Sequence, residues 1–486
     1  MKLKIALISA TALGMLMATG AVYAGDNNTT ALTMSGNNNT GTVVQNGSNN
    51  IAGQSGYGLN SSLAMHQDGS SNTLTITQTG NSNSVAYQSN YVIIPGAMAA
   101  EQEGSNNTAT LSQTAPDGGN ALGSFIQEGD YNSLNFTQNG TLGTGYVYNS
   151  VGAIYQGSAT GADPRGHSIP AGVGGNSLTV TQTQVGNGFQ TGNSIETIYQ
   201  AGPNDTATIT QYGTYNALVS LQQIGSGGYN TATVQEQGQG NRINTVTQDG
   251  SNNQATVKLL GDYNGADSAS PRFDGGPYNP NGGGLARSPY GWAYLPNGFT
   301  VGSAAASVAL VSADDVTQTG SYNVLTYTAS GNSNAYGFVQ NGTGNTTTAS
   351  SYNDSNQVAV GMQGSYNTVN AYQSGGDNDI GVSIYGSYNN AGSPFTGTAA
   401  TGHVWGLSGG DIFQENGSGN SAQLNVGTSL SDSDNNLFAA LQYGSDNHAT
   451  GSVTGSYNQA VVVQVGSNNS AAFTQSGSGN NAYVQQ

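Results

Sequence analysis

The chain contains no cysteine, only seven lysines and arginines, and no apolar run beyond its first 24 residues that is long enough to cross a bilayer. Without cysteine, disulfide bonds cannot stabilise the fold, so its stability has to come from another source. Seven basic residues against 25 acidic ones exclude a phosphate-binding surface, and we expect no nucleic-acid partner. The absence of a long apolar helix predicts that the protein is not an integral membrane protein.

Residues 1–24 have the pattern of a secretory signal peptide. Lys2 and Lys4 form the positive start, residues 5–18 form the apolar stretch, and the small residue Ala24 ends the segment. The apolar stretch is too short, and too soon followed by polar sequence, for a membrane anchor. We therefore expect a secreted protein with an extracellular location at the cell surface.

Catalytic and metal-binding patterns are also scarce. The four histidines, His66, His167, His403 and His448, are isolated, and no pair has metal-ligand spacing. Residues 406–410 fit the Gly-x-Ser-x-Gly pattern of a nucleophile elbow, but such a match is expected by chance in a chain with 74 glycines. We predict no enzymatic activity, no catalytic residues and no cofactor.

A calcium site is the remaining metal hypothesis. Residues 432–436 start like a calcium loop, but Leu437 stands where glycine is needed and no closing glutamate follows. Residues 375–379 resemble one unit of a calcium-binding β-roll, yet the unit does not recur. We predict no metal site.

The most informative positive feature is an eleven-residue period near the end of the chain. Asparagines recur at Asn447, Asn458, Asn469 and Asn480, each with alanine two residues later. Glutamine follows six residues after Asn458 and Asn469, and glycine opens the segment before the next asparagine. A short fixed period indicates stacked identical units and argues against a disordered chain.

The same unit appears upstream, for example from Asn72 to Gln78, and Asn216 leads to Leu218 and Gln222. Five segments interrupt the period, and they hold every proline except Pro203, as a sheet protein requires. These segments are 91–100, 114–122, 141–175, 262–315 and 391–411. We therefore divide the chain into a signal peptide (1–24), a repeat region (25–261), a Pro/Gly-rich insertion (262–315) and a second repeat region (316–486).

Residues alternate with a period of two within each unit, so Asn, Ala, the apolar residue and Gln face the same side of a strand. The glycine segment supplies a tight reversal, and two eleven-residue arms make one strand-turn-strand layer. Layers stacked about 4.8 Å apart would pair every backbone group with the next layer. The sequence predicts an all-β fold, a β-solenoid with a cross-β, amyloid-like core and loop insertions.

The interior of such a solenoid would contain amide side chains. A buried amide without partners costs about 1–3 kcal/mol, a cost that is avoided when each layer offers an identical amide at the same height. We therefore expect ladders of asparagine and glutamine along the stack, with unsatisfied strand edges at its two ends. Because no cap is recognisable at either end, we expect an open edge to be the working surface.

The arrangement Gln-x-Gly-x-x-Asn-x-Ala-x-x-x-Gln, as in residues 464–475, resembles the curlin repeat of curli, the secreted amyloid fibres of bacteria. The resemblance implies a fibre subunit that crosses the outer membrane unfolded, through an export machinery and with a nucleator as partner. It also implies polymerisation with copies of itself, for biofilm matrix and cell adhesion. The positions that match the family's amide ladder are Asn72, Gln78, Asn107, Gln113, Asn132, Gln138, Gln211, Asn447, Asn458, Gln464, Asn469, Gln475 and Asn480.

Some alternatives stay open. A monomeric β-solenoid adhesin that binds ice or carbohydrate through rows of threonine is a second hypothesis. A third hypothesis, a solenoid enzyme acting on polysaccharide, lacks support because the sequence has no recurring carboxylate pair.

The repeated Gly-Ser-Tyr-Asn turns would present either an aromatic binding ladder or tyrosines that shield the backbone. Acidic turn residues such as Asp130 and Asp446 are gatekeepers against early assembly or ordinary solvated residues.

Overall fold

The computed structural model describes residues 17–18, 22–24, 27–53, 65–86, 100–116, 119–140, 149–157, 174–185, 192–273, 292–296, 299–300, 302–392 and 394–486. His167 and most of the segment 141–175 lie outside these residues. The prediction that this whole segment interrupts the period was wrong, because Ser150–Gln156 form a strand that pairs in register with the layers on both sides. The chain divides into two compact units, and each is described by itself. Unit 1 comprises residues 1–240 and 270–294, and unit 2 comprises residues 241–269 and 295–486.

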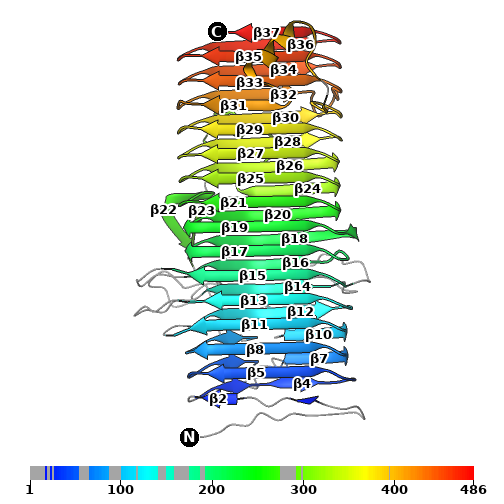
Figure 1. Cartoon of the computed structure of the whole chain (residues 1–486), viewed down its shortest axis with the longest axis vertical. Coiled ribbons are helices and arrows are strands. Elements are labelled where there is room, and N and C mark those ends of the chain that lie inside the picture. The colour runs from blue at the N-terminus through cyan, green and yellow to red at the C-terminus, as the bar shows by residue number, and fades with distance from the viewer. Residues whose placement is uncertain are drawn as a thin grey trace. The chain divides into compact units, whose positions relative to one another are not determined.

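Unit 1 consists of two parallel sheets whose strands alternate along the chain (Figure 1). Sheet 1A contains β3 (Thr29–Thr30), β4 (Leu32–Met34), β6 (Ile51–Ala52), β7 (Met65–Ser70), β9 (Ser84–Val85), β10 (Ala100–Ser105), β12 (Ala121–Glu128), β14 (Ser150–Gln156), β16 (Ser194–Gln200) and β18 (Ala217–Gly228). Sheet 1B contains β1 (Met17–Ala18), β2 (Val22–Ala24), β5 (Thr40–Asn46), β8 (Thr73–Gly80), β11 (Thr108–Ala115), β13 (Ser133–Asn139), β15 (Ser177–Gln184), β17 (Thr206–Thr214) and β19 (Thr231–Gln239).

Unit 2 repeats this arrangement. Sheet 2A contains β20 (Arg242–Ser251), β24 (Asp315–Ser321), β26 (Ala335–Thr343), β28 (Gln357–Gln363), β30 (Asp379–Tyr385), β32 (Ser421–Val426), β34 (His448–Thr454) and β36 (Ser470–Ser476). Sheet 2B contains β21 (Gln254–Leu260), β25 (Val324–Ser330), β27 (Thr346–Tyr352), β29 (Thr368–Ser374), β31 (Asp411–Glu415), β33 (Leu437–Tyr443), β35 (Gln459–Val465) and β37 (Asn481–Gln485).

The remaining elements belong to the insertions. They are the paired strands β22 (Ala266–Phe273) and β23 (Trp292–Pro296) and the short 3-10 helices η1 (Ala305–Ser307) and η2 (Gly397–Trp405). None of the helices in the described part of the chain has the length and apolarity of a membrane span.

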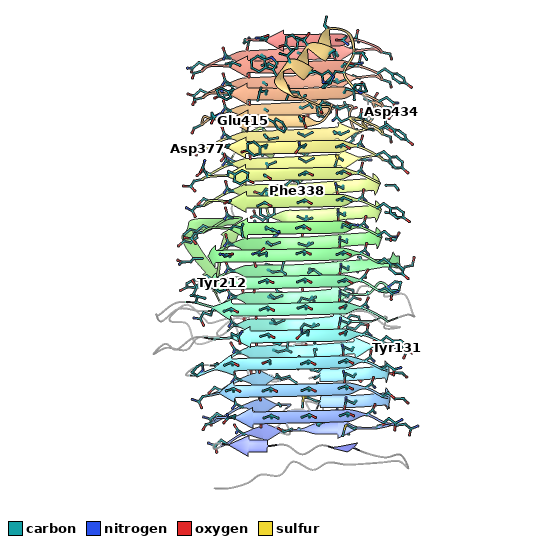
Figure 2. All side chains as sticks on the ribbon, in the orientation of Figure 1. Tyr131, Tyr212, Phe338, Asp377, Glu415 and Asp434 are labelled. Carbon is teal, nitrogen blue, oxygen red and sulfur yellow. The ribbon has the colours of Figure 1, made fainter. Side chains whose placement is uncertain are left out.

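Each strand pairs in register with the equivalent strand of the next layer, so each layer copies the one before. In unit 1, Leu74 pairs with Ala109 and Gln78 with Gln113. Inward positions alternate with outward ones, and the inward apolar residues are fully buried between the two sheets, as Phe338 is in unit 2 (Figure 2). The nearly all-β architecture of stacked parallel strands confirms the predicted β-solenoid.

Four strands of sheet 1A, β12, β14, β16 and β18, contain one residue more than the repeat unit. From Asn216 to Gln223 there are seven steps instead of six, and Gln223 pairs with Gln200 of the preceding layer. Each bulge stacks on the next, since Ser124 pairs with Ala153 and Thr197 with Ser220. The expected inward position of Gln222 was therefore wrong: the bulge turns Gln222 to the half-buried outer face and brings Gln223 inside.

Three of the insertions leave the stack in the middle of a strand. One leaves after Ala86 and returns at Ala100, because Val85 pairs with Leu122 while Ala100 pairs with Phe125. The segment 262–315 stays in its layer through Gly265, whose N–H donates to the Asn334 carbonyl. It returns at Asp314, whose N–H donates to the Tyr336 carbonyl. A layer can therefore remain paired around a long excursion of its own chain.

Candidate functional site

The buried amides form hydrogen-bonded columns that run through several successive layers. In unit 1, Nε2 of Gln78 donates to Oε1 of Gln113 at 2.9 Å, and Gln113 donates to Gln138 at 2.8 Å. Gln138 continues to Gln182 at 2.8 Å, and Gln182 to Gln211 at 2.7 Å. All five side chains are fully buried. The cost of burying these amides is offset because each one meets an identical group in the next layer.

Asparagines form a second kind of column at the start of each strand. The backbone N–H of Asn107 donates to Oδ1 of Asn72 at 3.0 Å, and that of Asn132 donates to Oδ1 of Asn107 at 2.9 Å. In unit 2, the N–H of Asn469 donates to Oδ1 of Asn447 at 3.1 Å, and Asn480 donates to Asn458 at 3.0 Å. Each asparagine thus holds the first peptide of the following layer in register.

Two of the expected ladder glutamines have other partners. Gln211 donates to Oε2 of Glu236 at 2.6 Å, so a carboxylate takes the next amide position. Gln475 lies over Val453, and its Nε2 donates to the backbone carbonyl of Gln459 at 2.8 Å. Oε1 of Gln475 is buried without a partner. Gln464 does continue a ladder, donating to Gln486 at 2.9 Å.

The hydrogen bonds of these columns all point in one direction. Asparagine Oδ1 accepts from the following layer, and glutamine Nε2 donates to the following layer. The two sides of a layer are consequently different: the side toward the preceding layer presents amide donors at Asn and an acceptor at Gln. A stack of this kind has a direction. The donors and acceptors at each end of the stack match only one of the two sides of a further layer.

The turns explain why glycine recurs. Gly455 has a φ of +100°, and a Cβ there would lie 2.0 Å from the carbonyl oxygen of Gly477 in the next layer. The turn residue just before most of these asparagines is also left-handed; it is often Tyr, as at Tyr366 (φ +57°) and Tyr388 (φ +59°). These two rings stack with centroids 5.1 Å apart. Asp377 and Asp434 project from turns of the same unit (Figure 2).

Two insertions of unit 2 are held on the outer face of its sheets by the same arrangement. Gln459 exchanges two hydrogen bonds with Thr396, and Asn481 accepts from the N–H of Ala399 at 2.6 Å. On sheet 2A, Gln357 exchanges two hydrogen bonds with Thr300, and Asp379 accepts from the N–H of Ala305 at 2.9 Å. Burial raises the pKa of Asp379, while its hydrogen bonds from Ala305 and Ala304 lower it.

Carboxylates also line up along sheet 1A. Asp68 pairs with Glu103, and Glu103 with Glu128, in successive layers. Burial raises the pKa of Glu128, the hydroxyl of Tyr155 lowers it, and the charge of Glu103 raises it further. Among the described residues, no group of three histidine or acidic side chains has the geometry of a metal site.

The repeat itself matches a known family model. The model of the Curlin associated repeat matches residues 36–80, 69–114 and 455–486. No curated protein matches the chain. The matched segments contain β5, β8 and β35 to β37, the strands that carry the amide columns described above. Their repeats and the solenoid fold point to a structural protein, and the chain is a curlin-repeat protein.

Proposed function

We propose that the protein is a secreted structural subunit that assembles with copies of itself into extracellular curli-like fibres, for biofilm matrix and cell adhesion. The observation that carries this proposal is the directional amide column, in which one layer binds the next through identical side chains. Asn72, Asn107, Asn132, Asn447, Asn458, Asn469 and Asn480, with Gln78, Gln113, Gln138, Gln211, Gln464 and Gln475, are the assembly residues under this proposal. A nucleator and an outer-membrane export machinery are the partners that the family suggests.

The last layer that the structure describes supports the proposal. Asn458 and Gln464 are fully buried, whereas their equivalents one layer further, Asn480 and Gln486, are exposed. Ala482 and Val484 are only half-buried. A further layer would bury these side chains and form roughly ten backbone hydrogen bonds, each worth about 0.5–1.5 kcal/mol net. That gain opposes the ordering entropy of an incoming chain once an end exists to bind it.

Strand order makes the junction with a second copy specific. In unit 2, β36 of sheet 2A precedes β37 of sheet 2B, and in unit 1, β3 and β4 of sheet 1A precede β5 of sheet 1B. The alternation continues between copies only when β3 and β4 pair with β36, and β5 pairs with β37. In that register Asn39 of the second copy lies one layer after Asn480 of the first copy in the asparagine column, and Gln45 of the second copy lies one layer after Gln486 of the first in the glutamine column.

Seeded assembly tests the proposal. Residues 25–486 are refolded from denaturant and followed by thioflavin fluorescence, with and without preformed fibres. We expect a lag that seeds abolish and a cross-β diffraction pattern from the product. A soluble β-rich monomer that ignores seeds would contradict the proposal.

Gly477→Ala makes the test specific for the open layer. A Cβ at Gly477 meets no atom closer than Asn480 Nδ2 at 3.9 Å, but the equivalent contact at Gly455 shows that it would clash with a following layer. We expect seeds of this variant to elongate at least about tenfold more slowly, while its own unfolding free energy falls by only about 1 kcal/mol. Gly406→Ala, at a left-handed residue with no neighbour within 4 Å, is the control for strain alone.

A second candidate function has its own observation. The outer face of sheet 1B carries rows of small hydroxyl residues in register, none of them buried. One row contains Thr40, Thr73, Thr108, Ser133, Ser177, Thr206 and Thr231. A flat, uncharged array of this kind favours a monomeric adhesin that binds an ordered surface such as ice or crystalline polysaccharide. Thr75→Lys/Thr179→Lys would abolish binding to ice or cellulose if this function is correct, and Thr326→Lys/Thr348→Lys in unit 2 is the matched control.

A further inference from the structure

Residues of the expected signal peptide form strands on the edge of sheet 1B. In β1, Met17 pairs with Thr40 and Ala18 with Gly41. In β2, Val22 pairs with Val44 and Ala24 with Asn46. Both strands are parallel to β5, and together they span its length (Figure 1).

Sheet 1A has no such additional strands among the described residues. There, β3 pairs with β6 and β4 pairs with β7, and no described strand lies on their other side. With β1 and β2 in place, sheet 1B therefore extends beyond sheet 1A at this end of unit 1. Without them, both sheets would end at the same layer.

The edge of β5 is also the edge that a second copy needs. In the junction described above, β5 has to pair with β37 of the preceding copy, and a strand edge can hold only one parallel neighbour. The amides of the two edges are complementary, because the N–H of Asn39 would donate to Oδ1 of Asn480 and Nε2 of Gln486 would donate to Oε1 of Gln45. This repeats the pattern that joins Asn480 to Asn458 and Gln464 to Gln486.

We propose that the edge of β5 is the docking site for β37 of a second copy, and that β1 and β2 occupy this edge until the signal peptide is removed. This inference rests on the proposed function. Removal of residues 1–24, which accompanies export, then also uncovers the strand edge through which the chain joins a fibre. An unprocessed chain cannot add to the β37 end of another copy.

Elongation of preformed fibres distinguishes a chain whose β5 edge is covered by β1 and β2 from a chain whose β5 edge is free. Seeds made from residues 25–486 are supplied with either the processed chain or the full chain 1–486, and growth is measured by sedimentation. We expect the full chain to elongate the seeds at least tenfold more slowly. Val22→Pro/Tyr23→Pro in the full chain removes strand hydrogen bonds to β5 and is expected to restore the processed rate. Leu7→Pro/Ile8→Pro leaves β1 and β2 unchanged and is expected to remain slow.

Hydrogen exchange provides a readout that does not depend on assembly. In freshly diluted monomer, the amides of residues 40–46 should exchange at least tenfold more slowly in the full chain than in residues 25–486. Equal elongation rates, equal protection of β5, or no recovery in Val22→Pro/Tyr23→Pro would each overturn the inference while leaving self-assembly intact. Failure of the processed chain to elongate its own seeds would instead contradict the proposed function, whatever the protection of β5.

Discussion

Asp205 of unit 1 holds Asn230 of the next layer through two hydrogen bonds, to its backbone N–H at 2.9 Å and to its Nδ2 at 3.1 Å. Asp205 stands in the asparagine column, since its own N–H donates to Oδ1 of Asn176 at 2.9 Å. A carboxylate has therefore replaced an amide at a fully buried position. Burial raises the pKa of Asp205 to about 6, although the bonds from Asn230 and Gly202 lower it.

This pKa makes the stability of unit 1 depend on pH. Below about pH 4 the carboxyl is protonated in both the folded and the unfolded chain, so it carries no ionisation cost. As the pH rises from 4 to 6 the unfolded chain loses the proton first, and the free energy of unfolding falls by about 3 kcal/mol before it levels off. We expect Asp205→Asn to raise the unfolding free energy at pH 7 and to change it little at pH 4, as measured by urea denaturation.

Thr206→Ala provides the comparison for that experiment. Thr206 is an exposed residue of the same unit without an ionisable side chain, so its substitution should have the same effect at both pH values. An equal gain from Asp205→Asn at both pH values would mean that the amide improves packing and that ionisation is not the cause.

Gln138→Ala should destabilise unit 1 by about 1–3 kcal/mol, because it removes one bond to Gln113 and one to Gln182 and leaves their buried polar atoms unpaired. Gln138→Leu should cost less than the alanine variant, since an apolar side chain refills the space, as Leu259 and Val453 do at equivalent positions. Guanidinium denaturation measures both. Thr137→Ala on the outer face is the control, expected within about 0.5 kcal/mol of the unsubstituted protein. A Gln138→Ala variant as stable as this control would show that the column contributes nothing.

Asn481→Ala should release the helix η2 from sheet 2B. The side chain of Asn481 accepts from Thr398 and Ala399 at 2.6 Å each and donates to the carbonyl of Thr396 at 2.6 Å. Under η2 lies an apolar cluster that includes Val461 and Leu441 on the outer face of the sheet. We expect faster hydrogen exchange in residues 394–411 and stronger binding of a hydrophobic dye, because this face becomes exposed. Ser470→Ala, on the adjacent strand β36, should leave both unchanged.

Tyr388→Ser tests the stacked turn tyrosines. Serine occupies the same left-handed turn position at Ser333 and Ser355, so the substitution keeps the backbone and removes the ring stacked on Tyr366. We expect a loss of about 0.5–1.5 kcal/mol in the unfolding free energy. Unchanged stability, combined with weaker binding to a polysaccharide, would favour a binding role for the tyrosines over a structural one.

Much of the fold could be predicted from the sequence because the repeat encodes it locally. The spacing from Asn72 to Gln78 predicts the length of the strand, its inward face and the position of its turn. The next unit has the same spacing and predicts the same features. The break in the period predicts an insertion over 262–315. The point at which the chain leaves the stack could not be predicted, because Gly265 and Asp314 belong to one layer only through their pairing with Asn334 and Tyr336.

Other features depend on neighbours that no single repeat contains. The bulge that moves Gln223 inward is compatible with its layer because the layer before it contains the same bulge. In the sequence, Gln459 and Asn481 have the pattern of ordinary outward polar residues. Their role in holding the segment around helix η2 follows only from the structure. The partner of Gln475 could not be inferred either, since it depends on which residue, Val453, occupies the same height one layer away.

The sequence by itself determined the period and, in strands without a bulge, the inward side and the positions of the amides, because these follow from alternation along a single strand. Only the tertiary structure decided which layers stack on which, where insertions open a strand, which outer faces are covered, and that β1 and β2 lie on the edge of β5. These properties are hydrogen bonds and contacts between segments 22 or more residues apart, and a repeating sequence offers many such pairings that are locally equivalent.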